Sequence, residues 1–472
     1  MPAPIELRLS APKPRLVVGE GIVLDLNVRV LSGIEMVSPE LNRNRTSIRV
    51  EPRTASQQVL TGIDYVRVHR ISPLTQIEDA FHADAGAAWT VPVELLNYAP
   101  PLPADRYAIS LSYRFGDSEA DTVSSNTVEI EIVPAELITV SFRWFGGASA
   151  RDVLGGVWTA RTAQGEQWFW QCADAFDPGA LQFTVALGSP ARRPGARPAL
   201  AHLNDIHAMH FEKYVVWEQD GAVGYMRVHR SGFDEPGFVE HGLGTDARLI
   251  HPPLQQNDDS LLALVLGTGA NGQPACSLVS VGGSGGGTAR IAPLRSAASE
   301  GFALWPADGG AALVLLSDSA GRVSLMGAGR SGEILIPRPV QGLQLSQWMG
   351  AGIATGYFRE NDFLHLFAMD PQVRNAEPRI PARFETGRFP VPPGRFMGSG
   401  SRENGGCVLL FESQGGWLVL DGSQVFDVPR PSWSTGSPHV VPAAGGLYLV
   451  HHDPARGFVA ELLGEPAPAP LI

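Results

Sequence analysis

One hairpin pattern recurs along most of this chain and limits what it can fold into. An apolar run, a tight polar turn and a second apolar run occur seven times between Val157 and Gly464. The turns fall at Gly165, Gly221, Gly272, Gly321, Asp362, Gly416 and Gly457. Their spacing of 41 to 56 residues is close to that of tandem four-stranded modules, which repeat every ~40–50 residues. The pattern therefore predicts a series of similar antiparallel sheets.

The apolar runs beside these turns indicate how the sheets are packed. Leu261–Leu266 and Leu313–Leu316 are almost continuously apolar instead of alternating with polar residues. A strand has this composition when both of its faces are covered. We expect neighbouring sheets to cover these strands on either side, as they do in a ring. Outer fourth strands are predicted at Leu181–Leu187, Thr288–Pro293, Glu333–Pro337 and Gln424–Pro429.

A second element repeats in phase with the hairpins. Before most turns lies a pair of bulky residues, and in six of the seven cases glycine or proline follows it. The pairs are Trp144-Phe145, His210-Phe211, Ile250-His251, Leu304-Trp305, Trp348-Met349, Phe396-Met397 and Val440-Val441. Because proline cannot donate to a sheet ladder, it tends to end a strand. We therefore expect each pair to end the short innermost strand of its sheet.

At this architectural level residues 136–472 resemble the β-propeller superfamily. Seven copies of each element predict seven blades, and six is the alternative if the first unit is not a blade. The Trp-Asp and Gly-His pairs of WD40 blades are absent. Double glycines are expected before the second strand, whereas kelch blades place them after it; they are Gly155-Gly156, Gly309-Gly310, Gly405-Gly406 and Gly445-Gly446. The resemblance therefore implies a fold and carries over no functional residues.

Residues 1–135 follow a different rhythm. Apolar and polar residues alternate along Ile22–Val30 and along Tyr107–Tyr113, as expected for half-buried strands of a sandwich. The segment PADRYAISLSYRF followed by SSNTVEIEIV resembles the last two strands of bacterial immunoglobulin-like domains, which implies a tyrosine corner at Tyr107. The predicted fold is all-β: an immunoglobulin-like β-sandwich over 1–135 and a propeller over 136–472, with the boundary near Pro134–Leu137.

Composition excludes several classes of protein. A net charge of -12 argues against a nucleic-acid binder, which needs a basic surface. No apolar stretch approaches the ~18–20 residues of a membrane helix, and the N-terminus lacks the apolar core of a secretory signal, so we expect no membrane insertion and a cytoplasmic location.

The only lysines are Lys13 and Lys213, which leaves none where a phosphate-binding loop or a kinase needs one. Arginine used in place of lysine, with abundant alanine, glycine and proline, indicates a GC-rich bacterium.

The cysteines and histidines do not form a recognisable site. Cys172, Cys276 and Cys407 occur singly inside predicted strands, so we expect buried, reduced thiols. The densest group of metal-ligand residues is His202, Asp205, His207 and His210. On an extended strand His207 and His210 point to opposite faces, so they are not expected to share an ion. The sequence predicts no catalytic residue, no metal site and no cofactor.

Three other segments have more than one interpretation. The glycine-rich run Gly282–Gly287 leads into another strand and not into a helix, so it is interpreted as a blade connection and not as a phosphate cradle. Trp168 and Trp170 share a strand face and either stack on sugars or pack against a neighbouring blade. Arg192, Arg193 and Arg197 form a basic patch in a loop between blades, and they are the candidate partner-binding residues.

These observations favour a non-catalytic protein–protein interaction or scaffold protein, one component of a bacterial multi-protein system. A carbohydrate-binding propeller is the first alternative. Against it, the tryptophans of this chain do not recur at one blade position, as repeated sugar sites would require. A hydrolase or lyase with a site at the central channel is the second, because such sites combine residues scattered over several blades. Protein partners are expected, with a small carbohydrate as the alternative ligand.

Overall fold

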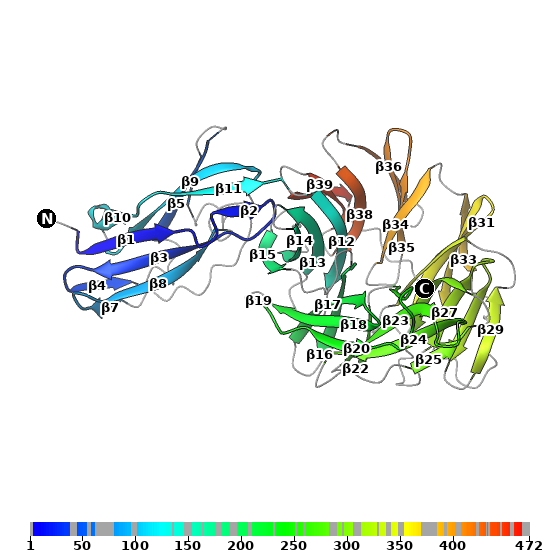
Figure 1. Ribbon diagram of the computed structural model, residues 1–472. Coiled ribbons are helices and arrows are strands. Elements are labelled where there is room, and N and C mark those ends of the chain that lie inside the picture. The colour runs from blue at the N-terminus through cyan, green and yellow to red at the C-terminus, as the bar shows by residue number, and fades with distance from the viewer. Residues whose placement is uncertain are drawn as a thin grey trace.

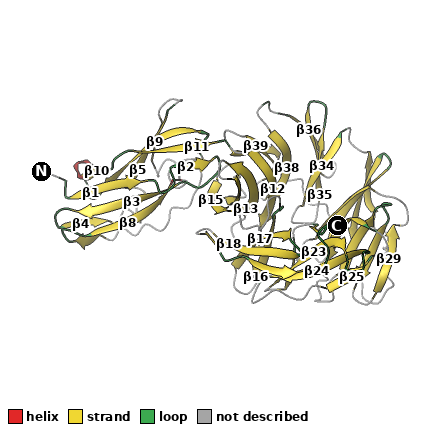
Figure 2. Cartoon of the chain, in the orientation of Figure 1, coloured by secondary structure: helices red, strands yellow, loops and turns green. Residues whose placement is uncertain are grey.

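A computed structural model of the chain shows an all-β protein (Figure 2). The residues that the structure describes are 3–37, 45–53, 58–61, 80–95, 102–116, 118–134, 136–145, 153–162, 165–174, 181–188, 196–205, 210–229, 232–250, 253–257, 260–282, 290–294, 297–304, 313–327, 330–336, 341–347, 354–369, 385–390, 394–401, 407–421, 424–430, 432, 435–443, 446–453 and 457–464. One 3₁₀ turn, η3 (Glu119–Asp121), is the sole helical element among them. None of these residues belongs to a helix with the length and apolar character needed to span a bilayer.

The N-terminal strands form two main sheets that enclose one core (Figure 1). The strands are β1 (Ile5–Ser10), β2 (Arg15–Val17), β3 (Val23–Val30), β4 (Ile34–Val37), β5 (Thr46–Pro52), β6 (Gln58–Thr61), β7 (Ala80–Ala83), β8 (Ala88–Glu94), β9 (Asp105–Arg114), β10 (Thr122–Ser124) and β11 (Val128–Val133). One sheet has the order β1-β3-β8 and the other β2-β11-β9-β5-β6, with β10 beside β9 and with β4 and β7 forming a separate pair. We call these elements the sandwich.

The alternation seen in the sequence places the core of the sandwich. On β3 the buried residues are Leu24, Leu26, Val28 and Val30, and the residues between them are more exposed. On β9 the tyrosine at position 107 is 3% exposed, and its hydroxyl donates a hydrogen bond to the backbone carbonyl of Pro103 at 2.8 Å. That bond, made to a residue four positions upstream, is the contact expected of a tyrosine corner.

The remaining strands form seven successive sheets among the described residues. The first three sheets consist of β12 (Glu136–Phe145), β13 (Val153–Thr162), β14 (Gly165–Asp174) and β15 (Leu181–Gly188); β16 (Ala199–Asp205), β17 (His210–Gln219), β18 (Ala222–His229), β19 (Gly232–Phe233) and β20 (Gly237–Glu240); and β21 (Arg248–Leu249), β22 (Leu254–Asn257), β23 (Ser260–Thr268), β24 (Pro274–Val281) and β25 (Arg290–Pro293). The last four consist of β26 (Ala298–Leu304), β27 (Leu313–Asp318), β28 (Val323–Gly327) and β29 (Arg330–Ile336); β30 (Gln341–Gln347), β31 (Ala354–Glu360), β32 (Phe363–Met369) and β33 (Glu385–Pro390); β34 (Arg395–Ser401), β35 (Cys407–Glu412), β36 (Gly416–Asp421) and β37 (Gln424–Pro429); and β38 (Thr435–Ala443), β39 (Gly446–Asp453) and β40 (Gly457–Gly464).

These sheets close into a β-propeller (Figure 1). The first strand of one sheet lies beside the first strand of the next, as β12 does beside β16, β26 beside β30 and β34 beside β38. The ring closes where β38 of the last sheet contacts β12 of the first. Each sheet therefore extends outward from an innermost first strand, and its faces are turned toward its neighbours.

Apolar packing between neighbouring sheets forms the core of the ring. Trp168 and Trp170 on β14 are fully buried in one cluster with Val215, Trp217 and Met226 of the next sheet. Further clusters join the third sheet to the fourth and the sixth to the seventh. Leu261–Leu266 on β23 is buried at every position, which confirms the prediction that both faces of this strand are covered.

The hairpin turns confirm the register of the repeat. All seven predicted turns lie between the second and third strands of their sheets. Gly165, Gly221, Gly272 and Gly321 have φ angles of 98°, 85°, 74° and 77°, a region that glycine enters without steric cost. In the fifth sheet Asn361 has φ 52°, which asparagine tolerates better than most residues. The predicted fourth strands are confirmed as β15, β25, β29 and β37.

The prediction for the bulky pairs is wrong in several sheets. Trp144-Phe145 and Leu304 do end β12 and β26, but His210-Phe211 begins the second strand β17. Phe396-Met397 lies near the start of β34, and Val440-Val441 lies inside β38, which continues through Pro442. An innermost strand has one edge without a ladder partner, so a proline there removes no sheet hydrogen bond. Proline therefore does not mark the end of these strands.

A glycine opposite a tryptophan provides a test of the packing around Trp217, which belongs to the cluster shared by the first and second sheets. Gly224 on β18 pairs in register with Trp217 on β17, and a Cβ at position 224 would lie 2.4 Å from the indole. We expect Gly224→Ala to destabilise the protein by ~1–3 kcal/mol, as overpacking does. Gly415→Ala is the matched control, because no atom lies within 4 Å of its added carbon. Urea unfolding midpoints should fall for Gly224→Ala alone; equal midpoints for both variants would contradict the packing described.

Candidate interaction surface

The repeated strand order brings one set of loops to one face of the ring. In each sheet the first strand begins beside the end of the second, as the pairs Glu136–Arg161 and Arg395–Glu412 show. The turn between the second and third strands therefore lies at the same end as the start of the innermost strand. Because every sheet repeats this order around the ring, these turns open on one face, which we call the turn face.

Exposed arginine–carboxylate pairs occur on the turn face in several sheets. In the first sheet Arg161 pairs with Glu136 at 3.2 Å, and both side chains are 65% exposed. In the fourth sheet Arg322 pairs with Asp318 at 2.7 Å. Such exposed pairs contribute little to stability, with a typical value of ~0–1 kcal/mol. Their charges therefore remain available to a partner without a large loss of fold stability.

The sixth sheet carries a group of three charged side chains on this face. Arg395, 73% exposed, and Arg430, 43% exposed, both lie near the carboxylate of Glu412, at 2.8 and 3.6 Å. The guanidinium of Arg430 also lies 5.9 Å from the ring centroid of buried Trp417, within the range of a cation–π contact. Two arginines share one glutamate here, so this part of the surface carries an excess positive charge.

The third and fourth sheets are joined by polar contacts on the same face. Arg248 donates to the backbone carbonyl of Ala298 on β26, at 3.4 Å. Asp246 accepts hydrogen bonds from the Thr268 hydroxyl at 2.7 Å and from its backbone N–H at 3.1 Å. These two bonds lower the pKa of the Asp246 carboxyl. The Asp246 carboxylate is thus held ionised by Thr268.

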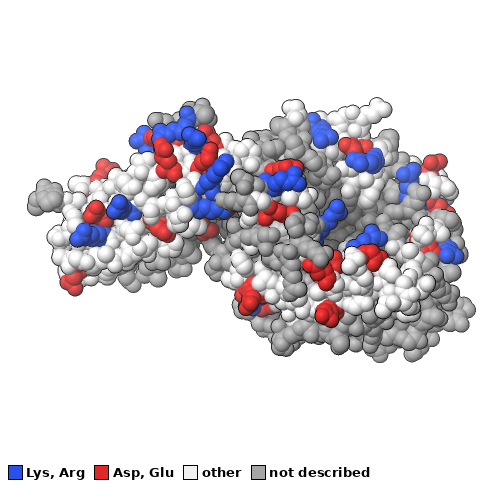
Figure 3. All heavy atoms as spheres, in the orientation of Figure 1, with Lys and Arg blue, Asp and Glu red and all other residues white. Residues whose placement is uncertain are grey.

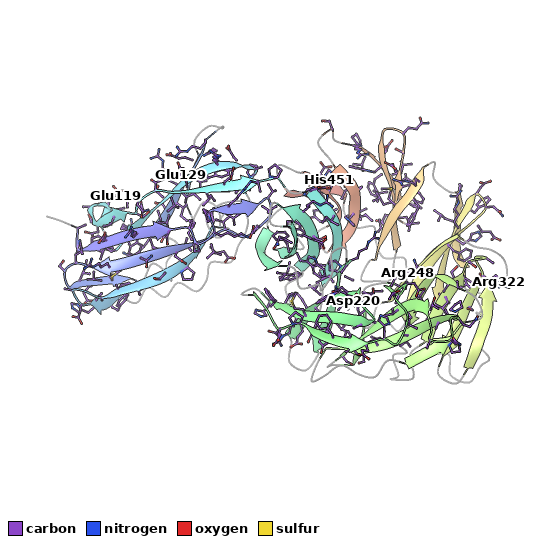
Figure 4. The ribbon with its side chains drawn as sticks, viewed as in Figure 1. Glu119, Glu129, Asp220, Arg248, Arg322 and His451 are labelled. Atoms are coloured by element: carbon purple, nitrogen blue, oxygen red, sulfur yellow. The ribbon has the colours of Figure 1, made fainter. Side chains whose placement is uncertain are left out.

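Figure 3 shows Lys, Arg, Asp and Glu side chains distributed over the described part of the propeller surface. Figure 4 labels Asp220, Arg248 and Arg322, which come from the second, third and fourth sheets. Their separation in the sequence shows how the ring brings distant segments to one surface. The arrangement supplies charge-assisted hydrogen-bond donors and acceptors from different sheets, which a complementary surface can engage together.

Three buried histidines face glutamates, and sequence reasoning missed this feature. His241 is fully buried; its Nδ1 accepts from the backbone N–H of Leu243, and its Nε2 lies 3.1 Å from Glu218. The Nε2 atoms of His365 and His451 lie 3.5 and 3.4 Å from Glu360 and Glu461. For His365 the signal was present, since it and Glu360 flank the turn at Asn361-Asp362. The other two pairs depend on contacts between strands that spacing alone does not specify.

The predicted partner-binding loop is described only in part. Arg197 is exposed, two residues before β16, and lies on the turn face because it connects a fourth strand to the next first strand. Arg192 and Arg193 lie outside the described residues. A role for these arginines in binding a partner stays a prediction.

The other candidate residues are placed as follows. Backbone register sets Asp205 opposite His210. The structure does not describe the side chains of these two residues or of His202. His207 lies wholly outside the described residues. Across the described ranges no group of three or more His, Cys, Asp or Glu side chains is arranged to hold a metal ion. Cys276 is a buried free thiol, as expected.

Two further interpretations are resolved by the structure. Trp168 and Trp170 are 0% exposed, so packing against the neighbouring sheet is correct for them, and they offer no surface on which a sugar could stack. The glycine-rich run from Gly282 connects β24 to β25, which confirms that it leads to a strand.

Comparison with known proteins identifies no family. No protein-family model matches the chain. No curated protein matches it either. Among solved structures, BBS1N in complex with ARL6DN is similar at 8% identity and TM-score 0.42, covering 71% of this chain and 99% of that one. The WD40 domain of SCAP from fission yeast is similar at 10% identity and TM-score 0.33, covering 68% and 79%. The NanB sialidase from Streptococcus pneumoniae is similar at 9% identity and TM-score 0.34, covering 98% and 92%. With TM-scores this low, none of them assigns a function.

A histidine on an innermost strand makes stability depend on pH. His439 lies half-buried on β38, and burial lowers its pKa to about 4 from the ordinary 6.5. The unfolded chain therefore binds this proton more tightly, and folding stability is lost as pH falls from 6.5 toward 4. The loss is at most about 3 kcal/mol, the full equivalent of that difference in pKa.

Urea unfolding at pH 7 and pH 4.5 tests this effect in the wild type and in His439→Gln. We expect a smaller loss of unfolding free energy at pH 4.5 in the variant, because it has no imidazole to protonate. The same loss in both proteins would show that His439 is not responsible.

Proposed function

We propose that this chain is a non-catalytic protein–protein interaction protein that docks a protein partner on the turn face of its propeller. The observation that carries the proposal is the set of arginine–carboxylate pairs on the turn face, in which each arginine is exposed, contributed by the first, fourth and sixth sheets. Charged pairs on the rim of an interface steer association and set specificity more than they set affinity. Their distribution over separate sheets favours a broad partner surface over a small ligand.

The proposed architecture has two domains, an immunoglobulin-like sandwich over 1–135 and a seven-bladed propeller over 136–472. Support for the sandwich comes from the split first strand: β1 pairs antiparallel with β3, while β2 pairs in parallel with the last strand β11. The Tyr107 hydroxyl bond adds to it. Support for seven blades comes from the seven sheets among the described residues and from the contact between β38 and β12.

The proposal is tested by charge reversal on the turn face. A photoreactive amino acid is first placed at position 322 or 395, and crosslinking in the native host identifies the partner. The affinity of the protein for that partner is then measured by calorimetry. We expect Arg161→Glu and Arg395→Glu each to weaken binding about tenfold, as the loss of a rim charge and its replacement by a repulsive one would do. Raising the salt concentration should weaken wild-type binding more than binding by the variants.

The control is Arg53→Glu in the sandwich. Arg53 is 49% exposed and pairs with Glu129, so the same charge change is made at a comparable exposed pair in the sandwich and outside the turn face. Its affinity should equal that of the wild type. A chain with no reproducible crosslinked partner, or with equal losses in all three variants, would contradict the proposal.

A further inference from the structure

The first sheet of the propeller has two apolar faces, and only one of them is turned toward the second sheet. Val157, Trp168 and Trp170 belong to the cluster shared with the second sheet. On the other face Trp158 of β13 stacks on Phe169 of β14, with ring centroids 4.1 Å apart and planes inclined by 19°. Each of these two rings is only 1% exposed, so something covers them.

The cover comes from the sandwich. Val17 on β2 and Val133 at the end of β11 pack against Trp158, Ala160 and Phe169. Val17 and Val133 are register partners on neighbouring strands, and so are Trp158 and Phe169. Two cross-strand pairs therefore pack face to face, and we call this contact the joint.

A glycine brings the backbone of the sandwich close to the joint. Gly19 has φ 87°, and a Cβ at this position would lie 3.2 Å from the Cζ2 atom of Trp158. Glycine is suited to both the positive φ and the close approach. Leu16 and Val18, the neighbours of Val17, point into the core of the sandwich. Val17 thus serves the joint and not the sandwich core.

Hydrogen bonds hold the segment that carries Val17. The N–H of Val18 donates to the carbonyl of Val133 at 3.0 Å. The buried carboxylate of Glu20 accepts from the N–H of Val17 at 3.0 Å and pairs with Lys13. A buried charge with these partners fixes the turn, because breaking either contact would leave the carboxylate unsatisfied. The sandwich side of the joint is therefore stiff.

We propose that the sandwich docks on the first sheet as a rigid body, so that sandwich and turn face are presented to a partner in one fixed orientation. Figure 1 shows β2 and the end of β11 against the first sheet. Presentation to a partner rests on the proposed function, whereas the rigid contact at the joint does not depend on it.

Distances between two spin labels test the joint in the full chain. Labels are placed at Glu119→Cys on the sandwich and Gln273→Cys on the third sheet, both exposed positions, after the three native cysteines have been replaced by alanine. Double electron–electron resonance should give one narrow distance in this parent. Val17→Asp should broaden the distribution severalfold, because a carboxylate cannot be buried unpaired against the indole.

The matched control is Val23→Asp, the same change in the same sandwich at a side chain that is 47% exposed. It should keep the narrow distribution. A broad distribution in the parent, or a narrow and unchanged one in Val17→Asp, would overturn the inference.

A second pair of variants keeps the test valid if Val17→Asp does not fold. Gly19 and Gly86 have φ angles of 87° and 89°, but no atom lies within 4 Å of a Cβ at position 86. Phenylalanine thus imposes the same backbone strain at both positions, but only at position 19 must its ring displace Trp158. Gly19→Phe should shift or broaden the distance distribution and Gly86→Phe should not; identical distributions would overturn the inference.

Discussion

The propeller depends on apolar packing between the faces of successive sheets. A single four-stranded sheet would leave both faces of its second strand in water, yet the second strand β23 is buried over Leu261–Leu266. Burial of a leucine or valine side chain contributes ~1.5–3 kcal/mol, so such a strand is stable only between two neighbours. Closure of the ring by β38 and β12 supplies the last neighbour. The turn face follows from this closure, because identical strand order brings loops from every sheet to one side.

The same requirement explains the place of the sandwich. A ring gives each sheet two neighbours. The stacked rings of Trp158 and Phe169 on the first sheet are covered by Val17 and Val133 of the sandwich. The N-terminal strands therefore complete a buried face of the propeller, and the two parts of the molecule are coupled by packing as well as by the chain between β11 and β12.

Sequence periodicity predicted those features that a local pattern determines. Turn positions such as Gly221 and Gly272 follow from backbone angles that few residues adopt, and buried runs such as Leu261–Leu266 follow from two covered faces. The innermost strands were predicted less well, because their free edge tolerates Pro442 and removes the signal that ends a strand. The joint lies between segments brought together by the tertiary fold, and the His241–Glu218 and His451–Glu461 pairs depend on side-chain directions that spacing alone does not specify. Of the turn face, the sequence indicated the loop with Arg197. It did not indicate the arginine–carboxylate pairs, because in the sequence Arg395 and Arg161 cannot be told from any other exposed arginine.

Hydrogen exchange in a variant of the last sheet tests closure of the ring most directly. On β39 Leu447 and Leu449 pack toward the sixth sheet, so Val450, 2% exposed, faces the opposite way, toward the first sheet. Val450→Asp should accelerate amide exchange in β12 and β13, at the other end of the propeller sequence, whereas Val425→Asp at a 59% exposed site should not. Faster exchange confined to β34–β40, with β12 and β13 unchanged, would show that the first and last sheets do not support each other and would contradict a closed ring.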